Sequence, residues 1–246
     1  MTEVIASFGR KAPTYLAHAG VQEELAEWLA EWLPKKREGR ALEIGAGPGV
    51  FTRHLVPWKG TLLATDGSRA MCAAGRAAWP DATWRTMVAD RPAAGPWDWI
   101  FSSSMLQWAD DPAAVFTAWR KRLAPRGRVL AGFFVAGSLD EWSALAGRAP
   151  LEWRTPEVWR ALLAASGLRL VRDDARSRIL HYSSAAALLR SLHGTGAAPL
   201  RRLSPARLRS LLREYENRHR TRDGVPARWI FFRFEADLGV KRSGLR

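Results

Sequence analysis

Three glycines separated by single residues follow an acidic residue in this chain. Glu43 lies near the end of a short apolar run, and Gly45, Gly47 and Gly49 follow it after Ile44. Glycine adopts positive φ without a steric penalty and lets a ligand approach the backbone closely. A helix that starts after such a turn directs free N–H groups toward whatever lies on the turn. The pattern is therefore typical of a turn that binds a small molecule at the end of a buried strand.

The acid and the glycine spacing indicate the kind of ligand. A dinucleotide fingerprint has the spacing GxGxxG, and Val50 stands where its third glycine would be. Glu43 also puts a carboxylate where a pyrophosphate would lie. A carboxylate repels phosphate, whereas it pairs with an amino group or accepts from a hydroxyl. The predicted ligand is a nucleoside that carries a cation, and S-adenosylmethionine (SAM) has these features.

Two further acids end the next predicted strands. Asp66 ends the run 61–66 and Asp90 ends the run 84–90. In doubly wound folds an acid after the second strand binds the two ribose hydroxyls, and we expect this of Asp66. We expect Asp90 to accept a hydrogen bond from the adenine amino group. An adenosine-type cofactor is therefore predicted, held by Glu43, Gly45, Ala46, Gly47, Gly49, Asp66, Gly67 and Asp90.

Strands and helices alternate through the middle of the chain and would position these residues. Strands are predicted at 41–44, 61–66, 84–90, 97–102 and 128–134, with helices at 69–78 and 112–123. This alternation predicts a parallel, doubly wound sheet with helices on both faces. Three regions follow: a helical segment over the cofactor at 1–39, a cofactor-binding core at 40–135, and a C-terminal part at 136–246.

The C-terminal part is predicted to insert helices before the last strand. A helix at 156–166 ends at Gly167, and a strand pair at 168–172 and 179–182 follows. Helical segments then occupy about 183–222, where Ser204 is a predicted N-cap followed by Pro205. The last strand is predicted at 229–234. An insertion at this place can act as a lid over the ligand.

Charge is distributed unevenly along the 246 residues. The formal net charge is +14, and residues 146–246 hold 21 Lys and Arg against 9 Asp and Glu, a net charge of +12. A bias toward Arg codons explains Arg over Lys but not this placement. The basic half is therefore predicted to meet an acidic partner.

Composition argues against several classes of protein. The single cysteine, Cys72, excludes a disulfide within the chain, fits a reducing cytoplasm and is expected to serve packing. The histidines are scattered and no CxxC is present, so no metal site is predicted. We expect a cytoplasmic protein without a membrane span, because no run of 18 apolar residues and no signal-like N-terminus is present.

Longer motifs resemble known families. The order of the strand-end acids, the glycine turn and Trp97-Asp98-Trp99-Ile100 resembles the class I SAM-dependent methyltransferases over residues 40–135. A closer resemblance is to the malonyl-acyl carrier protein O-methyltransferases of biotin synthesis. Its motifs are FGRKAPTYLAHA at 8–19, SSSMLQW at 102–108, FFVAGSL at 133–139 and LRSLHGTGA at 189–197. The last motif lies in the predicted lid, so it is the most specific of the four.

The resemblance implies a fold and an activity. The fold is an α/β, doubly wound, Rossmann-like class I methyltransferase sheet with an N-terminal helical segment and a helical lid before the last strand. The activity is methyl transfer from SAM to the free carboxylate of malonyl thioester on acyl carrier protein, which leaves S-adenosylhomocysteine (SAH). The methyl ester primes pimeloyl synthesis for biotin. No general base is needed, because a carboxylate is ionised at pH 7.

The same motifs imply site residues. Substrate or catalytic contacts are expected from Tyr15, Gln107, Arg190 and His193, and further cofactor contacts from His18, Ser102, Ser103 and Trp108. Arg190 is the candidate for holding the carboxylate through two parallel hydrogen bonds. The chain departs from the family motifs at two positions, where Ser103 replaces Asn and His193 replaces Lys. The second exchange removes a fixed positive charge.

An acidic carrier protein is the predicted partner, and neither a membrane nor a nucleic acid is expected. Its docking surface would be a set of arginines in the lid: Arg201, Arg202, Arg207, Arg209 and Arg213. Three alternatives stay open. One is a methyltransferase for another small carboxylic acid such as trans-aconitate. The others are an RNA methyltransferase, whose basic half would bind phosphates, and a SAM-binding protein without turnover.

Overall fold

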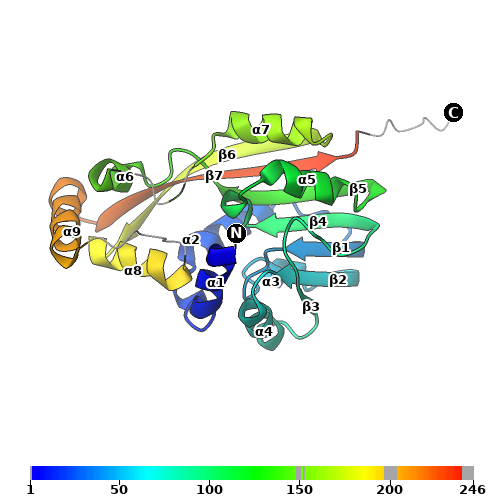
Figure 1. Cartoon of the computed structure of the whole chain (residues 1–246), viewed down its shortest axis with the longest axis horizontal. Coiled ribbons are helices and arrows are strands. Elements are labelled where there is room, and N and C mark those ends of the chain that lie inside the picture. The colour runs from blue at the N-terminus through cyan, green and yellow to red at the C-terminus, as the bar shows by residue number, and fades with distance from the viewer. Residues whose placement is uncertain (1, 148–150, 152, 197–203, 240–246) are drawn as a thin grey trace.

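A seven-stranded sheet forms the centre of the computed structural model, which describes residues 2–147, 151, 153–196 and 204–239 (Figure 1). The strand order is β3-β2-β1-β4-β5-β7-β6. Strand β7 is antiparallel to its two neighbours, and the other pairs are parallel. The order reverses between β1 and β4, which is where such sheets bind ligands. The strands are β1 (Glu38–Ile44), β2 (Lys59–Asp66), β3 (Thr83–Thr86), β4 (Trp97–Ser103), β5 (Leu123–Phe134), β6 (Arg169–Tyr182) and β7 (Val225–Asp237).

Helices cover both faces of the sheet, as the alternation of strands and helices predicts. Neighbouring residues of β4 point to opposite faces: Ile100 packs in one apolar cluster and Phe101 in the other. The Ile100 cluster includes α5 and α7, and the Phe101 cluster includes α2, α3 and α4. The helices are α1 (Thr2–Lys11), α2 (Gly20–Ala30), α3 (Thr52–Leu55), α4 (Arg69–Ala78), α5 (Pro112–Arg120), α6 (Asp140–Ala146), α7 (Pro156–Ala165), α8 (Ala185–Thr195) and α9 (Pro205–His219), with 3-10 turns at Leu16–His18 and Leu106–Trp108.

The insertion between β6 and β7 consists of α8 and α9, as predicted, and lies at one end of the molecule (Figure 1). Leu192 of α8 and Tyr215 of α9 are buried in a third apolar cluster with Trp142 of α6 and Trp229 of β7. The Tyr215 hydroxyl donates to the Pro226 carbonyl at 2.9 Å. The insertion therefore shares a core with the first half of the last strand.

The start of α9 and the end of α7 lie where the sequence predicts them. The Ser204 hydroxyl accepts from the Arg207 N–H at the start of α9. Gly167 follows α7 with φ +76°, a conformation that favours glycine. A serine N-cap such as Ser204 stabilises a helix by about 1 kcal/mol. Cys72 is buried on α4, in agreement with a packing role.

Two predicted strands are wrong in extent. β3 ends at Thr86, so Asp90 is not the last residue of a strand. The predicted pair at 168–172 and 179–182 is one strand of 14 residues, β6. The polar run Asp173–Arg178 suggests a turn, but β6 is an edge strand, and charged residues are well tolerated on an edge.

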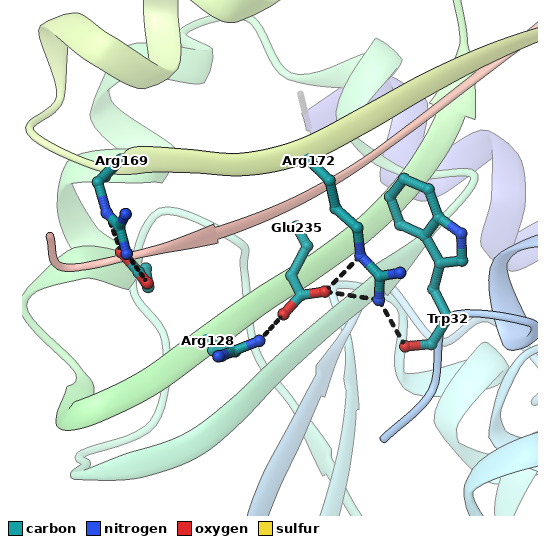
Figure 2. Close-up of polar contacts among 6 residues, drawn as sticks. Trp32, Arg128, Arg169, Arg172 and Glu235 are labelled. Carbon is teal, nitrogen blue, oxygen red and sulfur yellow. Dashed lines mark hydrogen bonds and ion pairs between the residues drawn. The ribbon is translucent and has the colours of Figure 1, made fainter. Parts of the chain in front are cut away.

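A buried carboxylate links the three strands at this edge (Figure 2). Glu235 of β7 is 2 % exposed, and it is paired with Arg128 of β5 and with Arg172 of β6 at 2.7 Å. The Arg172 guanidinium also lies 4.1 Å from the ring centroid of Trp32. Both carboxylate oxygens are thus satisfied by charged donors, which offsets the cost of burying the charge.

Candidate active site

A cavity with about 830 Å³ of space, part of it open to solvent, lies at the carboxyl ends of β1, β2 and β4. The glycine turn lines the cavity with Glu43, Gly45, Ala46 and Gly47. From α1, Val4, Ile5 and Phe8 also line it. The cavity therefore occupies the switch point of the sheet, with the N-terminal helix against it.

The glycine turn has the left-handed backbone that its sequence predicts. Gly45, Gly47 and Gly49 have φ of +73°, +57° and +98°. A Cβ on Gly45 would lie 2.3 Å from Met105, whereas one on Gly47 would meet nothing within 4 Å. Gly47 therefore leaves space beside the backbone. Gly49 does not line the cavity, and it packs against Trp79.

Glu43 is a buried acid at the end of β1, with an exposed fraction of 1 %. The Thr52 hydroxyl donates to its Oε2 at 2.7 Å. Burial, and to a smaller degree the charge of Asp66, raises the pKa of Glu43 to about 8, although the Thr52 hydrogen bond opposes the rise. An ammonium group in the cavity would form an ion pair with the ionised Glu43 and so favour loss of its proton.

Asp66 is organised by backbone groups at the end of β2. Its Oδ2 accepts from the Gly47 N–H at 3.0 Å and its Oδ1 from the Ser68 N–H at 2.7 Å. Burial raises the pKa of Asp66, and these two hydrogen bonds oppose the rise. Each oxygen keeps a lone pair for one more donor. Two adjacent hydroxyls are the kind of ligand that this carboxylate can hold. Gly67 lines the same cavity.

The structure places Asp90 outside the lining of the main cavity. Its side chain is exposed, and it borders a separate surface depression with Arg91 and Lys121. The three residues before it, Met87, Val88 and Ala89, line the main cavity instead. The chain after Thr86 crosses the cavity edge as a loop, and this loop carries Asp90 past the site.

The three serines at the end of β4 and just after it have different surroundings. Ser102 donates to the Ile44 carbonyl at 2.9 Å and does not line the cavity, contrary to its predicted cofactor contact. Ser103 and Ser104 both line it, and their buried hydroxyls have no hydrogen-bond partner among the residues that the structure describes. Ser104, which the sequence did not single out, has φ +58°. A left-handed backbone is rare for serine, and such strain is frequent at functional sites.

Aromatic side chains from the N-terminal motif and from the turn after β4 meet at the cavity wall. Phe8 packs edge-on against Trp108 with 5.2 Å between ring centroids, and it lies 6.3 Å from Tyr15. Tyr15 is 8 % exposed and lines the cavity, as does Trp108. Burial and the charge of Asp66 raise the pKa of Tyr15 above the usual range, so its hydroxyl remains a proton donor.

A second cavity, with about 400 Å³ of space that includes open solvent, adjoins the first. Both cavities are lined by Phe8, Tyr15, Gln22, Ser104 and Trp108. The second also contacts Gln107, whose amide donates to the Ser104 carbonyl at 2.8 Å. Gln22 of α2 was missed because its helix shows only an apolar stripe in the sequence. A ligand in the first cavity and one in the second can therefore meet at this shared wall.

Three further predicted residues line neither cavity. Arg190 and His193 are exposed on α8 and line neither cavity. The helical period explains this, because Leu188 and Leu192 of the same helix are buried and Leu192 lines the second cavity. His18 packs against Gly194 of α8, so it holds the N-terminal segment to the insertion rather than lining the site.

Known proteins identify the fold and the family. A methyltransferase-domain family model matches residues 17–197. A malonyl-[acyl-carrier protein] O-methyltransferase from Alcanivorax borkumensis is 30 % identical over 94 % of this chain and 84 % of its own length. The chain belongs to this family. It is accordingly an O-methyltransferase of the SAM-dependent class.

Two further comparisons concern, respectively, the family and the fold. The biotin biosynthesis bifunctional protein BioCD of Bordetella avium is 32 % identical over 85 % of this chain and 48 % of its own length. The phosphoethanolamine N-methyltransferase 2 of Haemonchus contortus, solved with SAM, shares the fold with a TM-score of 0.56 at 16 % identity, over 91 % of this chain and 56 % of that one.

No helix in the described part of the methyltransferase is long and apolar enough to cross a membrane. Among the same residues, no group of three His, Cys, Asp or Glu side chains is arranged to hold a metal ion.

Proposed function

We propose that this chain transfers the methyl group of SAM to the free carboxylate of a malonyl thioester on acyl carrier protein, and that SAH is released. The methyl ester would enter pimeloyl synthesis for biotin in the cytoplasm. The observation that carries the proposal is the pair of adjoining cavities, because one contains the acids suited to SAM and the other offers an uncharged space for an acyl group. The family membership selects the acyl group.

The residues of the first cavity fit SAM. Glu43 is buried and gains by meeting a cation, so we assign it to the amino group of the cofactor. Asp66 keeps two lone pairs for the ribose hydroxyls. Gly47 leaves the space that a close ligand needs. We assign the backbone of Met87–Ala89 and the side chains of Ser103 and Trp108 to the remaining cofactor surface.

The chain itself has to orient the acceptor and exclude water. When bound, the sulfonium group supplies an activated methyl. A carboxylate oxygen forms a bond to the methyl carbon as the carbon–sulfur bond breaks, and the electron pair stays on sulfur. The protein needs no base for this step, because the nucleophile is already ionised. Phe8, Tyr15 and Trp108 close the wall between the cavities and keep water from the reacting atoms.

The three regions have separate roles in this proposal. Residues 1–39 cover the cofactor through α1, residues 40–135 bind it, and residues 136–246 carry a basic lid. All three regions line the second cavity, the last of them through residues such as Trp153 and Trp229. On α9, Arg207, Arg209 and Arg213 are exposed and form no ion pair with a described residue. We propose that they attract the acidic carrier protein. Arg201 and Arg202, which were predicted to join them, lie outside the described residues.

A labelling experiment tests the function. The purified protein is incubated with methyl-labelled SAM and, separately, with malonyl-acyl carrier protein, acetyl-acyl carrier protein, malonyl-coenzyme A, trans-aconitate and total tRNA. Label on the malonyl carrier protein but not on the acetyl form is expected. Label on trans-aconitate alone, or on tRNA alone, would replace the proposal by one of the alternatives. SAM binding without any label would indicate a protein without turnover.

A further inference from the structure

The second cavity, which we call the acceptor cavity because it would hold the acyl group, is lined by uncharged residues. Its lining residues in the described part of the chain include Gln22, Ser104, Gln107, Trp153 and Trp229, and none is Asp, Glu, Lys, Arg or His. The cation that the motif suggested, Arg190, is exposed elsewhere on α8. A substrate carboxylate entering this cavity must therefore be stabilised by something other than an ion pair with these residues.

Unpartnered polar groups are concentrated in the same wall. Gln22 is 6 % exposed, and its side-chain oxygen, a hydrogen-bond acceptor, has no partner among the described residues. The Ser104 hydroxyl and the Trp153 indole N–H are likewise buried without a partner in the part of the chain that the structure describes. Burying such groups costs about 1–3 kcal/mol each when they stay unpaired. The Ser104 hydroxyl and the Trp153 indole N–H can donate to a ligand that accepts hydrogen bonds, and a 180° rotation of the Gln22 amide presents its N–H groups to the same ligand.

A carboxylate matches these groups. Amide N–H, hydroxyl and indole N–H are all donors, and a carboxylate has four lone-pair positions to receive them. Hydrogen bonds to a charged acceptor are stronger than those between neutral groups. Gln22 and Ser104 also line the cofactor cavity, so their donors lie at the wall where the two ligands would meet.

We propose that the reacting carboxylate is held by the uncharged donors of Gln22, Ser104 and Trp153 rather than by a basic side chain. This inference rests on the proposed function and names how its acceptor is recognised. An arginine would hold the negative charge of the nucleophile most tightly before the reaction and so would oppose its loss. Neutral donors orient the oxygens with less of this penalty. The charge of the substrate is then balanced by the cofactor cation, and both charges disappear in the product.

Binding to the SAH complex tests the assignment without turnover. Calorimetry measures the affinity of malonyl-pantetheine and of acetyl-pantetheine, which lacks the carboxylate. The variants are Gln22→Leu and Trp153→Phe, each of which replaces one donor by an apolar side chain, and Gln22→Glu, which adds a repelling charge. Arg190→Ala represents the rival carboxylate clamp. SAH affinity and the melting temperature show that each variant is folded with an intact cofactor site.

We expect each donor variant to weaken malonyl-pantetheine binding by roughly 10-fold or more, as for loss of a hydrogen bond to a charged group, with acetyl-pantetheine unaffected. Gln22→Glu is expected to weaken it most. Turnover of the malonyl carrier protein should show the same order in KM. The inference would be overturned if the donor variants bound malonyl-pantetheine as tightly as the unmodified protein. It would also be overturned if Arg190→Ala alone lost this binding. A wild-type complex that does not prefer malonyl over acetyl would refute the proposed function itself.

Discussion

The Thr52 hydroxyl lies 2.7 Å from Glu43 Oε2, and this contact is the hydrogen bond that holds the buried acid of the glycine turn. A single neutral donor is a weak compensation for a buried negative charge. Glu43 accordingly has a raised pKa of about 8, and at pH 7 most of the ligand-free protein carries it protonated. A cation bound in the cavity would lower the pKa of Glu43 and so favour loss of that proton.

SAM affinity should therefore rise with pH. Below pH 8 the proton on Glu43 has to leave when the amino group of SAM binds, so the association constant increases by up to about tenfold per pH unit and levels off near pH 8. Calorimetry at pH 6, 7 and 8 in buffers of different ionisation enthalpy checks both the slope and the released proton. The Glu43→Gln variant should bind weakly and show no slope. Equal slopes in the two proteins would contradict the assignment.

The same group affects the stability of the ligand-free protein. The folded pKa of Glu43 lies above its ordinary value of 4.5, so its protonation stabilises the folded state at low pH, and this contribution is lost as the pH rises through 8. Urea denaturation between pH 5 and 8.5 should show that Glu43→Gln gains stability relative to the unmodified protein as the pH increases. A constant difference between the two proteins would argue against a raised pKa.

Asp66 and Asp90 should differ sharply in their effect on the cofactor. Asp66→Asn removes the charge that we assign to the ribose hydroxyls and disturbs its contacts with Gly47 and Ser68. We expect SAH affinity to fall about 10- to 100-fold, as for hydrogen bonds to a charged group. Asp90→Asn is the matched control, because Asp90 is exposed outside the cavity and its replacement should leave the affinity unchanged. Weakened SAH binding in Asp90→Asn would restore the role that the sequence suggested.

The basic lid should act on the carrier protein and not on the acyl group. Reversing Arg207, Arg209 and Arg213 to Glu places negative charge on α9, which repels an acidic partner. We expect KM for malonyl-acyl carrier protein to rise at least about tenfold at low salt, with that for malonyl-pantetheine unchanged. Arg126→Glu is the control, because β5 begins at the end of the sheet opposite α9 (Figure 1). Equal effects on both substrates would mean that the arginines act on the fold.

Glu235 should be the most sensitive ionic residue of the β5–β7–β6 edge. Glu235→Gln leaves Arg128 and Arg172 facing each other without their shared carboxylate (Figure 2). We expect a loss of about 1–3 kcal/mol in the free energy of unfolding, measured by urea denaturation. The pair Arg169–Asp237 is more exposed, with 60 % exposure at the arginine, so Arg169→Ala should cost less than about 1 kcal/mol. Equal losses would show that burial of Glu235 does not govern the effect.

Several features followed from the sequence alone, for local reasons. The turn around Gly47 and the acids Glu43 and Asp66 lie next to each other in strand-end patterns, so their proximity could be inferred from the way parallel strands align. The cap at Ser204 and the stop at Gly167 depend only on neighbouring residues. The lid motif identified the family because it combines unusual residues in a fixed order.

Other features were decided only by the tertiary structure. Asp90 lies outside the cavity lining because β3 ends at Thr86, four residues before its predicted end, where the pairing with β2 also ends. Arg190 turned outward because α8 buries Leu188 and Leu192 against the rest of the core. The neutral wall around Gln22, Ser104 and Trp153 brings together side chains from distant segments. Such contacts depend on how the elements pack, and a linear pattern of residue types does not contain that information.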